Sequence, residues 1–226
     1  MLRSAVSPAP ATIALAGALM LATVMGIGRF AYTPLLPGLR EALGWTLAQA
    51  GDVATANFVG YLIGALAAAP IAGHRTRAGW LAVALAASVV TTLLGAWLVD
   101  YRAWLPARFI AGVASAFGVV IGSALVLDAV AHSARPGRAV LYFPGVGIGI
   151  VFSVLAIEFA RAGGWSVFGQ WGMLGVAAGL FSALALAVVM RLPNLVPRPA
   201  APKADTPRAA PPVKRIVAAY GLLGFG

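Results

Sequence analysis

The chain has 226 residues, of which 61% are hydrophobic and 10% are charged, and its mean hydropathy is +0.93. Soluble domains carry about 25% charged residues, so this composition excludes an ordinary globular domain and a disordered chain alike. It predicts an all-α membrane protein that crosses the lipid bilayer several times. The formal net charge is +10, and the absence of cysteine excludes a disulfide framework, a thiolate metal site and a cysteine nucleophile.

Six apolar segments are long enough to cross a bilayer, because about 20 helical residues at about 1.5 Å each span about 30 Å of hydrocarbon. In chain order the predicted spans are Ala11–Leu36, Leu47–Gly73, Gly79–Val99, Ala103–Leu127, Ala139–Ile157 and Val167–Met190. We therefore predict a transmembrane bundle of six helices over residues 1–190.

Residues 191–215 have a different composition, rich in proline, alanine and basic side chains. Proline lacks the backbone N–H that a helix needs, so this segment is predicted to be an extended cytoplasmic linker. Residues 216–226 are apolar again. As a helix they rise only about 16 Å, half of a bilayer, which predicts the start of a seventh span that the sequence cuts short.

The distribution of basic residues predicts the orientation, because cytoplasmic loops are enriched in Lys and Arg. With the N-terminus inside, the cytoplasmic side carries eleven: Arg3, Arg75, Arg77, Arg135, Arg138, Arg191, Arg198, Lys203, Arg208, Lys214 and Arg215. The opposite loops carry three, which are Arg40, Arg102 and Arg161. We therefore predict a cytoplasmic N-terminus. Because the positive charge is spread over separate loops, it does not indicate a nucleic-acid partner.

Three charged residues lie inside the predicted spans, where a charge costs about 2.5 kcal/mol or more. Arg29 comes near the end of the first span, Asp52 near the start of the second, and Arg108 near the start of the fourth. Counted at about 1.5 Å per residue, all three lie roughly 8–12 Å below the outer surface. We predict that they form one charged cluster along a solute pathway, with Asn57 about two turns deeper.

An alternative applies to the two arginines, because long basic side chains near helix ends extend to the lipid headgroups. The shorter Asp52 needs either a partner or a proton. If its pairing changed between two conformations, Asp52 would couple a proton to transport. This coupling proton is a hypothesis.

Two further patterns concern contacts between helices. Arg75 and Arg77 follow the second span and Asp128 ends the fourth, so an ion pair there would join two helices as a cytoplasmic gate. The alternative is a solvated surface pair worth about 0–1 kcal/mol. Glycines four residues apart recur in four spans and predict close helix packing. These pairs are Gly60 and Gly64, Gly118 and Gly122, Gly145 and Gly149, and Gly175 and Gly179.

No catalytic arrangement is found in the sequence. It contains no His-x-x-x-His pair, no nucleophile beside a base and no phosphate-binding Gly-Lys-Ser/Thr loop. We expect no enzyme activity, no cofactor and no metal site, and the lack of a nucleotide site excludes a pump driven by this chain's own ATPase.

Several stretches resemble the major facilitator superfamily of transporters. Arg108-Phe-Ile-Ala-Gly112-Val-Ala-Ser-Ala116 is similar to that superfamily's Arg-x-x-x-Gly motif at the start of the fourth span. The segments Gly26–Pro37 and Asn57–Ala65 are similar to the bacterial YbfB/YjiJ-type subgroup. The loop after the second span keeps basic residues but lacks the acid that is usual in the superfamily. The antiporter motif of the fifth span is present only in part.

The resemblance implies a bacterial cytoplasmic membrane and a cavity lined by the first and fourth spans, which places Arg29 and Arg108 on the pathway. We predict Tyr32, Asn57 and Asp52 as further pathway residues. The resemblance also implies a secondary active transporter of a small solute, coupled to an ion or proton, and two cavity arginines favour an anionic solute. The chain matches only the first half of the superfamily's usual twelve spans. Two alternatives therefore stay open: an inactive fragment that lacks its C-terminal half, or a half-size protein that acts as a scaffold or as a dimer with a second copy.

Overall fold

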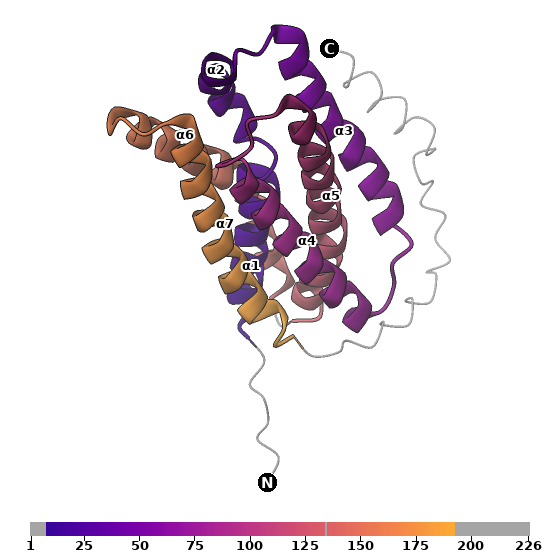
Figure 1. The fold of residues 1–226 in the computed structure, drawn as a ribbon. Coiled ribbons are helices and arrows are strands. Elements are labelled where there is room, and N and C mark those ends of the chain that lie inside the picture. The colour runs from indigo at the N-terminus through magenta and orange to yellow at the C-terminus, as the bar shows by residue number, and fades with distance from the viewer. Residues whose placement is uncertain (1–7, 134, 193–226) are drawn as a thin grey trace, which may run out of the picture. The chain divides into compact units, whose positions relative to one another are not determined.

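The computed structural model describes residues 8–133 and 135–192, all within one unit that ends at Leu195 (Figure 1). Six segments of this unit are long and apolar enough to cross a membrane, which confirms the predicted helical bundle. The predicted seventh span, and all of the predicted linker beyond Leu192, lie outside the described residues.

The first span is built from three consecutive helical pieces. They are α1 (Pro10–Leu21), the π-helix η1 (Ala22–Ile27) and α2 (Tyr32–Leu43). A turn over residues 28–31 separates η1 from α2. In the π-helical part each bond reaches back five residues, as from the Gly28 N–H to the Thr23 carbonyl at 2.8 Å. The span therefore contains a local break in its helical hydrogen bonding.

The first span also continues to Leu43, beyond its predicted end at Leu36. The two prolines near the predicted end do not stop the helix. Pro34 lies in the first turn of α2, where a missing N–H costs little, and Pro37 lies inside the helix.

The next three spans are α3 (Leu47–Ala68), α4 (His74–Leu94) and α5 (Tyr101–Ala131). The Thr46 side chain and Gln49 cap the start of α3 reciprocally. The basic stretch 74–77, predicted to be a separate turn, is the first turn of α4. It follows Gly73, whose φ of 83° is a conformation that glycine adopts without strain.

The last two spans are α6 (Gly145–Ala162) and α7 (Val167–Val189). The apolar segment long enough for the fifth span is Pro136–Ala162, which includes the predicted start at Ala139. Within it a short 3₁₀ helix, η2 (Pro136–Leu141), comes before α6. Pro144 then precedes α6 as its N-terminal cap residue. We call the end of the bundle with the α2–α3, α4–α5 and α6–α7 connections the outer end, after the predicted orientation.

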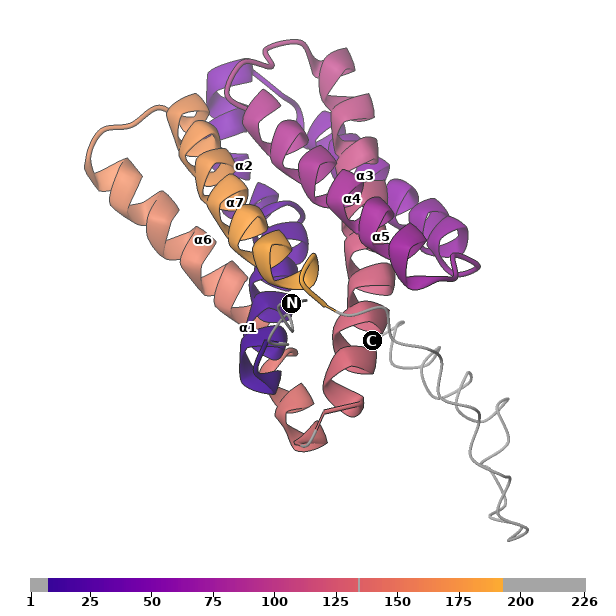
Figure 2. The same ribbon diagram turned by 90° about the horizontal axis from the view of Figure 1, so that it is seen from below.

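The six spans form two sets of three in space, and each set contains the first helix of the other half of the chain. Along the chain, the first three spans and the last three form two halves of equal size. In space, α5 packs against α3 and α4, while α1 and η1 pack against α6 and α7 (Figure 2). Contacts of α1 with α5 and of α4 with α7 join the two sets. The first helix of each half therefore completes the other half.

Glycine makes the closest helix contacts in both sets, as predicted. An added Cβ at Gly64 of α3 would lie 2.8 Å from the Val113 Cα of α5. An added Cβ at Gly149 of α6 would lie 2.6 Å from the Ala22 Cα of η1. Backbones can approach this closely only where no side chain intervenes, so these two glycine positions bring the helices into contact.

Candidate functional site at the break of the first span

The break in the first span is held by Arg108 of α5. This side chain is buried, with 4% of its surface exposed. Its Nη1 donates to the Gly28 carbonyl at 2.9 Å and its Nη2 donates to the Arg29 carbonyl at 3.1 Å. Backbone that leaves a helix inside a membrane must find partners within the protein, and the planar fork of a guanidinium can bind two carbonyls at once. Arg108 therefore binds the break and does not extend to the headgroups.

Tyr32 and Asn57 connect this contact to two more helices. The Asn57 Nδ2 of α3 donates to the Arg108 carbonyl at 2.9 Å. The Tyr32 ring of α2 lies 5.0 Å from the Arg108 Cζ, and its hydroxyl donates to the Ala50 carbonyl at 2.9 Å. The structure thus brings three of the predicted pathway residues, Tyr32, Asn57 and Arg108, together from three spans.

Arg29 lies in the same turn but is held differently. Its Cζ lies 4.0 Å from the centre of the Tyr61 ring, 4.7 Å from that of Phe58 and 5.7 Å from that of Phe30. The side chain is half-buried, and its buried Nε has no hydrogen-bond partner among the described residues. A guanidinium within about 6 Å of aromatic ring centres is attracted by their faces. Three rings therefore hold the Arg29 charge without neutralising it.

The prediction that Asp52 belongs to the same charged cluster is wrong. Asp52 is exposed, and its Oδ2 accepts a hydrogen bond from the Tyr101 hydroxyl at 2.8 Å. Within the described part of the chain it makes no ion pair with either arginine. The estimate of depth used Cα positions, whereas the Arg29 side chain extends to Phe58, six residues or about 9 Å further along α3.

On the inner end, one of the two predicted gate contacts is present. The Arg77 Nη1 of α4 lies 3.6 Å from the Asp128 Oδ2 of α5, which confirms an ion pair between two helices. The Arg77 Nε also donates to the Ile71 carbonyl at 3.0 Å. Arg75 is exposed and forms no ion pair among the described residues.

The aromatic residues around Arg29 were missed by the sequence analysis. Phe58 and Tyr61 are three residues apart on α3, so they share one face of the helix. Phe58 directly follows Asn57, which was predicted to lie on the pathway. In the sequence, the signal for a partner of an arginine was an aromatic pair at this spacing beside an intramembrane amide.

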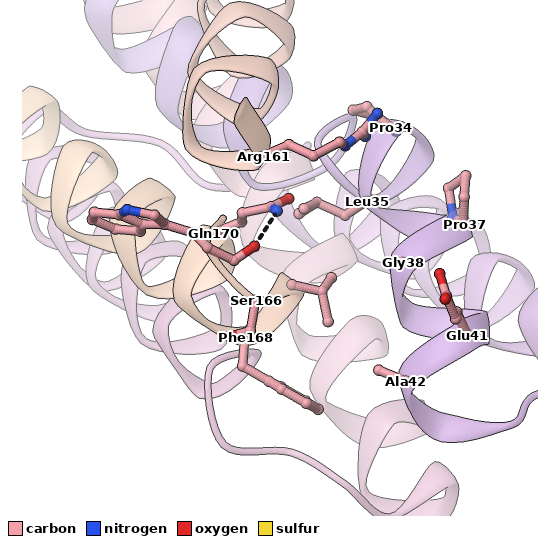
Figure 3. A pocket seen from close by; sticks show the side chains of 12 residues that line it. Pro34, Leu35, Pro37, Gly38, Glu41, Ala42, Arg161, Ser166, Phe168 and Gln170 are labelled. Atoms are coloured by element: carbon pink, nitrogen blue, oxygen red, sulfur yellow. Dashed lines mark hydrogen bonds between the residues drawn. The ribbon is translucent and has the colours of Figure 1, made fainter. Parts of the chain in front are cut away.

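A cavity of about 560 Å³ lies elsewhere, at the outer end between α2 and the start of α7 (Figure 3). Leu35 and Pro37 line it from α2, and Phe168 and Gln170 line it from α7. None of the predicted site residues lines this cavity. Within the described residues there is also no cluster of His, Asp and Glu that could hold a metal ion.

These features define a class: a multi-pass helical membrane protein with a broken span and intramembrane charge, as membrane transport proteins have. The model of a family described as "Uncharacterised MFS-type transporter YbfB" matches residues 20–226, and the chain belongs to that family. Its family therefore indicates transport as the role of this protein. No curated protein matches the chain.

Proposed function

We propose that this chain forms half of the solute pathway of a secondary active transporter. The observation that carries the proposal is the local break in the hydrogen bonding of the first span, with the charge of Arg29, unpaired among the described residues, beside it. Helices interrupted near the bilayer midplane build the substrate sites of many secondary transporters. Intramembrane charges mark such pathways because they are too costly to keep without a purpose.

The pathway residues we assign are Arg29, Tyr32, Asn57 and Arg108. The proposal is supported by the contacts of Arg108, Tyr32 and Asn57, which connect the broken span to α3 and α5. A movement of one of these spans therefore displaces the others. Arg29 supports the proposal because its charge is presented at the broken backbone itself. The transported solute is a small molecule, and the unneutralised guanidinium favours an anionic one.

The energy source we propose is an ion gradient. Asp52 is the candidate carrier of a coupling proton, since its carboxylate is exposed and bound by the Tyr101 hydroxyl. In the proposal, a second conformation of the protein releases this hydrogen bond. On the inner end, the ion pair of Arg77 with Asp128 is the proposed gate, with exposed Arg75 beside it.

In the proposal, the wall of the pathway opposite Arg29 is supplied by the C-terminal half that is typical of the superfamily, or by a second copy of this chain. Measuring the mass of the purified protein in detergent distinguishes a monomer from a dimer. A monomer without transport would support the alternative of a scaffold or inactive fragment.

The experiment that tests the proposed function is uptake into membrane vesicles from cells that express the chain. A panel of labelled anionic, neutral and cationic solutes is compared with vesicles from cells without it. We expect saturable uptake of at least one solute that stops when an ionophore collapses the gradient. Uptake of no solute above the control contradicts the proposal. Unchanged proton-coupled uptake by the Asp52→Asn variant would remove Asp52 from the mechanism.

A further inference from the structure

The side chains around the Arg29 guanidinium suit one class of ligand. We propose that Arg29, held by Phe30, Phe58 and Tyr61, binds the carboxylate of a monovalent organic anion with an apolar body. This inference rests on the proposed function, since it names the class of solute for the same pathway.

The first support is that the donors of Arg29 are free. Among the described residues, no carboxylate or carbonyl oxygen accepts a hydrogen bond from its side chain, and its Nε is buried without a partner. Aromatic faces attract the charge but provide no oxygen acceptor for the five N–H donors. A carboxylate can accept two parallel hydrogen bonds from a guanidinium, which is the strongest pairing this group makes.

The second support is depth. Phe58 and Tyr61 lie near the middle of α3, about 17 and 21 Å along the helix from its outer start at Leu47. The Arg29 guanidinium contacts both rings, so it is directed toward the midplane and does not extend to the outer headgroups. A charge placed at that depth is costly unless an opposite charge meets it, and transporters bind their substrates at this level.

The third support concerns the charge and the body of the ligand. Both Nη atoms of the neighbouring Arg108 already donate to backbone carbonyls, so among the described residues Arg29 is the intramembrane guanidinium whose Nη donors are left for a ligand. One guanidinium fork pairs with one carboxylate. Beside it, Phe58 exposes 57% of its surface, and Leu62, one turn further along α3, exposes 62%, which offers an apolar wall to the rest of the ligand.

The test uses benzoate as the probe and measures its binding to the purified chain in lipid nanodiscs by equilibrium dialysis. We expect saturable binding of benzoate that benzamide and benzylamine do not displace, because they keep the ring but lack the negative charge. Phthalate, which carries two negative charges, is expected to bind at least about tenfold more weakly, since its second carboxylate is desolvated without a partner.

Variants then separate the charge from the rings. Arg29→Met is expected to weaken benzoate binding about tenfold or more, and Arg29→Lys to restore part of it. The control is Arg102→Met, which removes an exposed arginine on α5 and is expected to change nothing. Tyr61→Leu is expected to weaken binding about two- to fivefold, as the loss of one cation–π contact should. Its control, Phe159→Leu, removes a ring that is 81% exposed on α6.

The inference is overturned if benzoate shows no saturable binding up to millimolar concentrations. It is also overturned if benzamide competes equally, or if the Arg29→Met variant binds benzoate like the parent. Thermal unfolding of each variant checks that it is folded, and Arg29→Lys provides a second comparison if Arg29→Met is not. Gradient-driven uptake of neutral or cationic solutes without benzoate binding would reject this inference alone. Benzoate binding without any uptake would reject the proposed function alone.

Discussion

Arg108 is an intramembrane charge whose hydrogen bonds are made to backbone. Replacing it with methionine keeps much of its volume but leaves the carbonyls of Gly28 and Arg29 without their donors. An unsatisfied buried acceptor costs about 1–3 kcal/mol, so we expect Arg108→Met to lower the free energy of unfolding by at least that amount. The measurement is thermal or denaturant unfolding of the purified protein in detergent.

Two comparisons sharpen this prediction about Arg108. Arg108→Lys should recover only part of the stability, because an ammonium lacks the planar fork that reaches both carbonyls. Arg102→Met removes an exposed arginine of the same helix and should stay within about 0.5 kcal/mol of the parent. Equal stability of Arg108→Met and Arg102→Met would show that Arg108 does not hold the break.

At the level of single residues, helical rise converts position into depth, and on that basis the sequence placed Arg29 and Arg108 at one level of the bundle. Asn57 was predicted about two turns deeper, yet its side chain binds the Arg108 carbonyl. The sequence could not place Asp52 correctly. Helical rise fixes the height of a Cα but not the direction in which the side chain leaves it. A long side chain such as Arg29 moves its charge by several ångströms along the membrane normal, here toward Phe58 and away from Asp52.

At the level of helices, each span was predicted, but the positions of its ends were predicted less accurately. Apolar length is a strong signal for a span, whereas a proline signals both the first turn and the end of a helix. The first span was therefore predicted to end at Leu36, whereas α2 continues to Leu43, and the apolar residues of η2 could not be distinguished from the start of a longer helix. The π-helix had no signal in composition, since its residues are as apolar as those before them.

The contact between α6 and η1 gives a prediction with a matched control on one helix. An added Cβ at Gly149 would lie 2.6 Å from the Ala22 Cα, so Gly149→Ala must push the two backbones apart. We expect a loss of about 1–3 kcal/mol in the free energy of unfolding, the usual cost of overpacking.

Gly147 is the control, because nothing lies within 4 Å of an added Cβ there. Gly147→Ala should be neutral or stabilising by up to about 1 kcal/mol, since alanine favours a helix over glycine. Both variants are measured by unfolding in the same detergent. If Gly147→Ala is destabilised as much as Gly149→Ala, helix propensity and not the contact with η1 determines the result.

At the level of the whole molecule, the six spans followed from apolar length alone, but their arrangement did not. The partners of the first span lie on α6 and α7, and those of α5 lie on α3 and α4. Glycine pairs indicate that a helix face is close to another helix without saying which one. The exchanged packing could therefore be seen only in three dimensions.

The proposed orientation, with the N-terminus in the cytoplasm of a bacterium and the bundle in its inner membrane, can be tested directly. The chain has no cysteine, so single cysteines can be added without a prior substitution. Ala162 and Gly137 are exposed at opposite ends of the bundle. We expect an impermeant maleimide to label Ala162→Cys on intact spheroplasts and to label Gly137→Cys only after permeabilisation. The reverse pattern of labelling would invert the orientation.

The exchanged packing also has a consequence for how the protein is made. The close contact of Gly26 with Gly149 joins the first span to the fifth. Synthesis of the chain between them takes about 6 to 25 s at about 5–20 residues per second. During that interval the first span has left the ribosome without the helix that covers η1, and Arg108 emerges only partway through it. The first span therefore enters the membrane before the side chain and the helix that contact its break, and the insertion machinery must keep the break away from lipid until the later spans arrive.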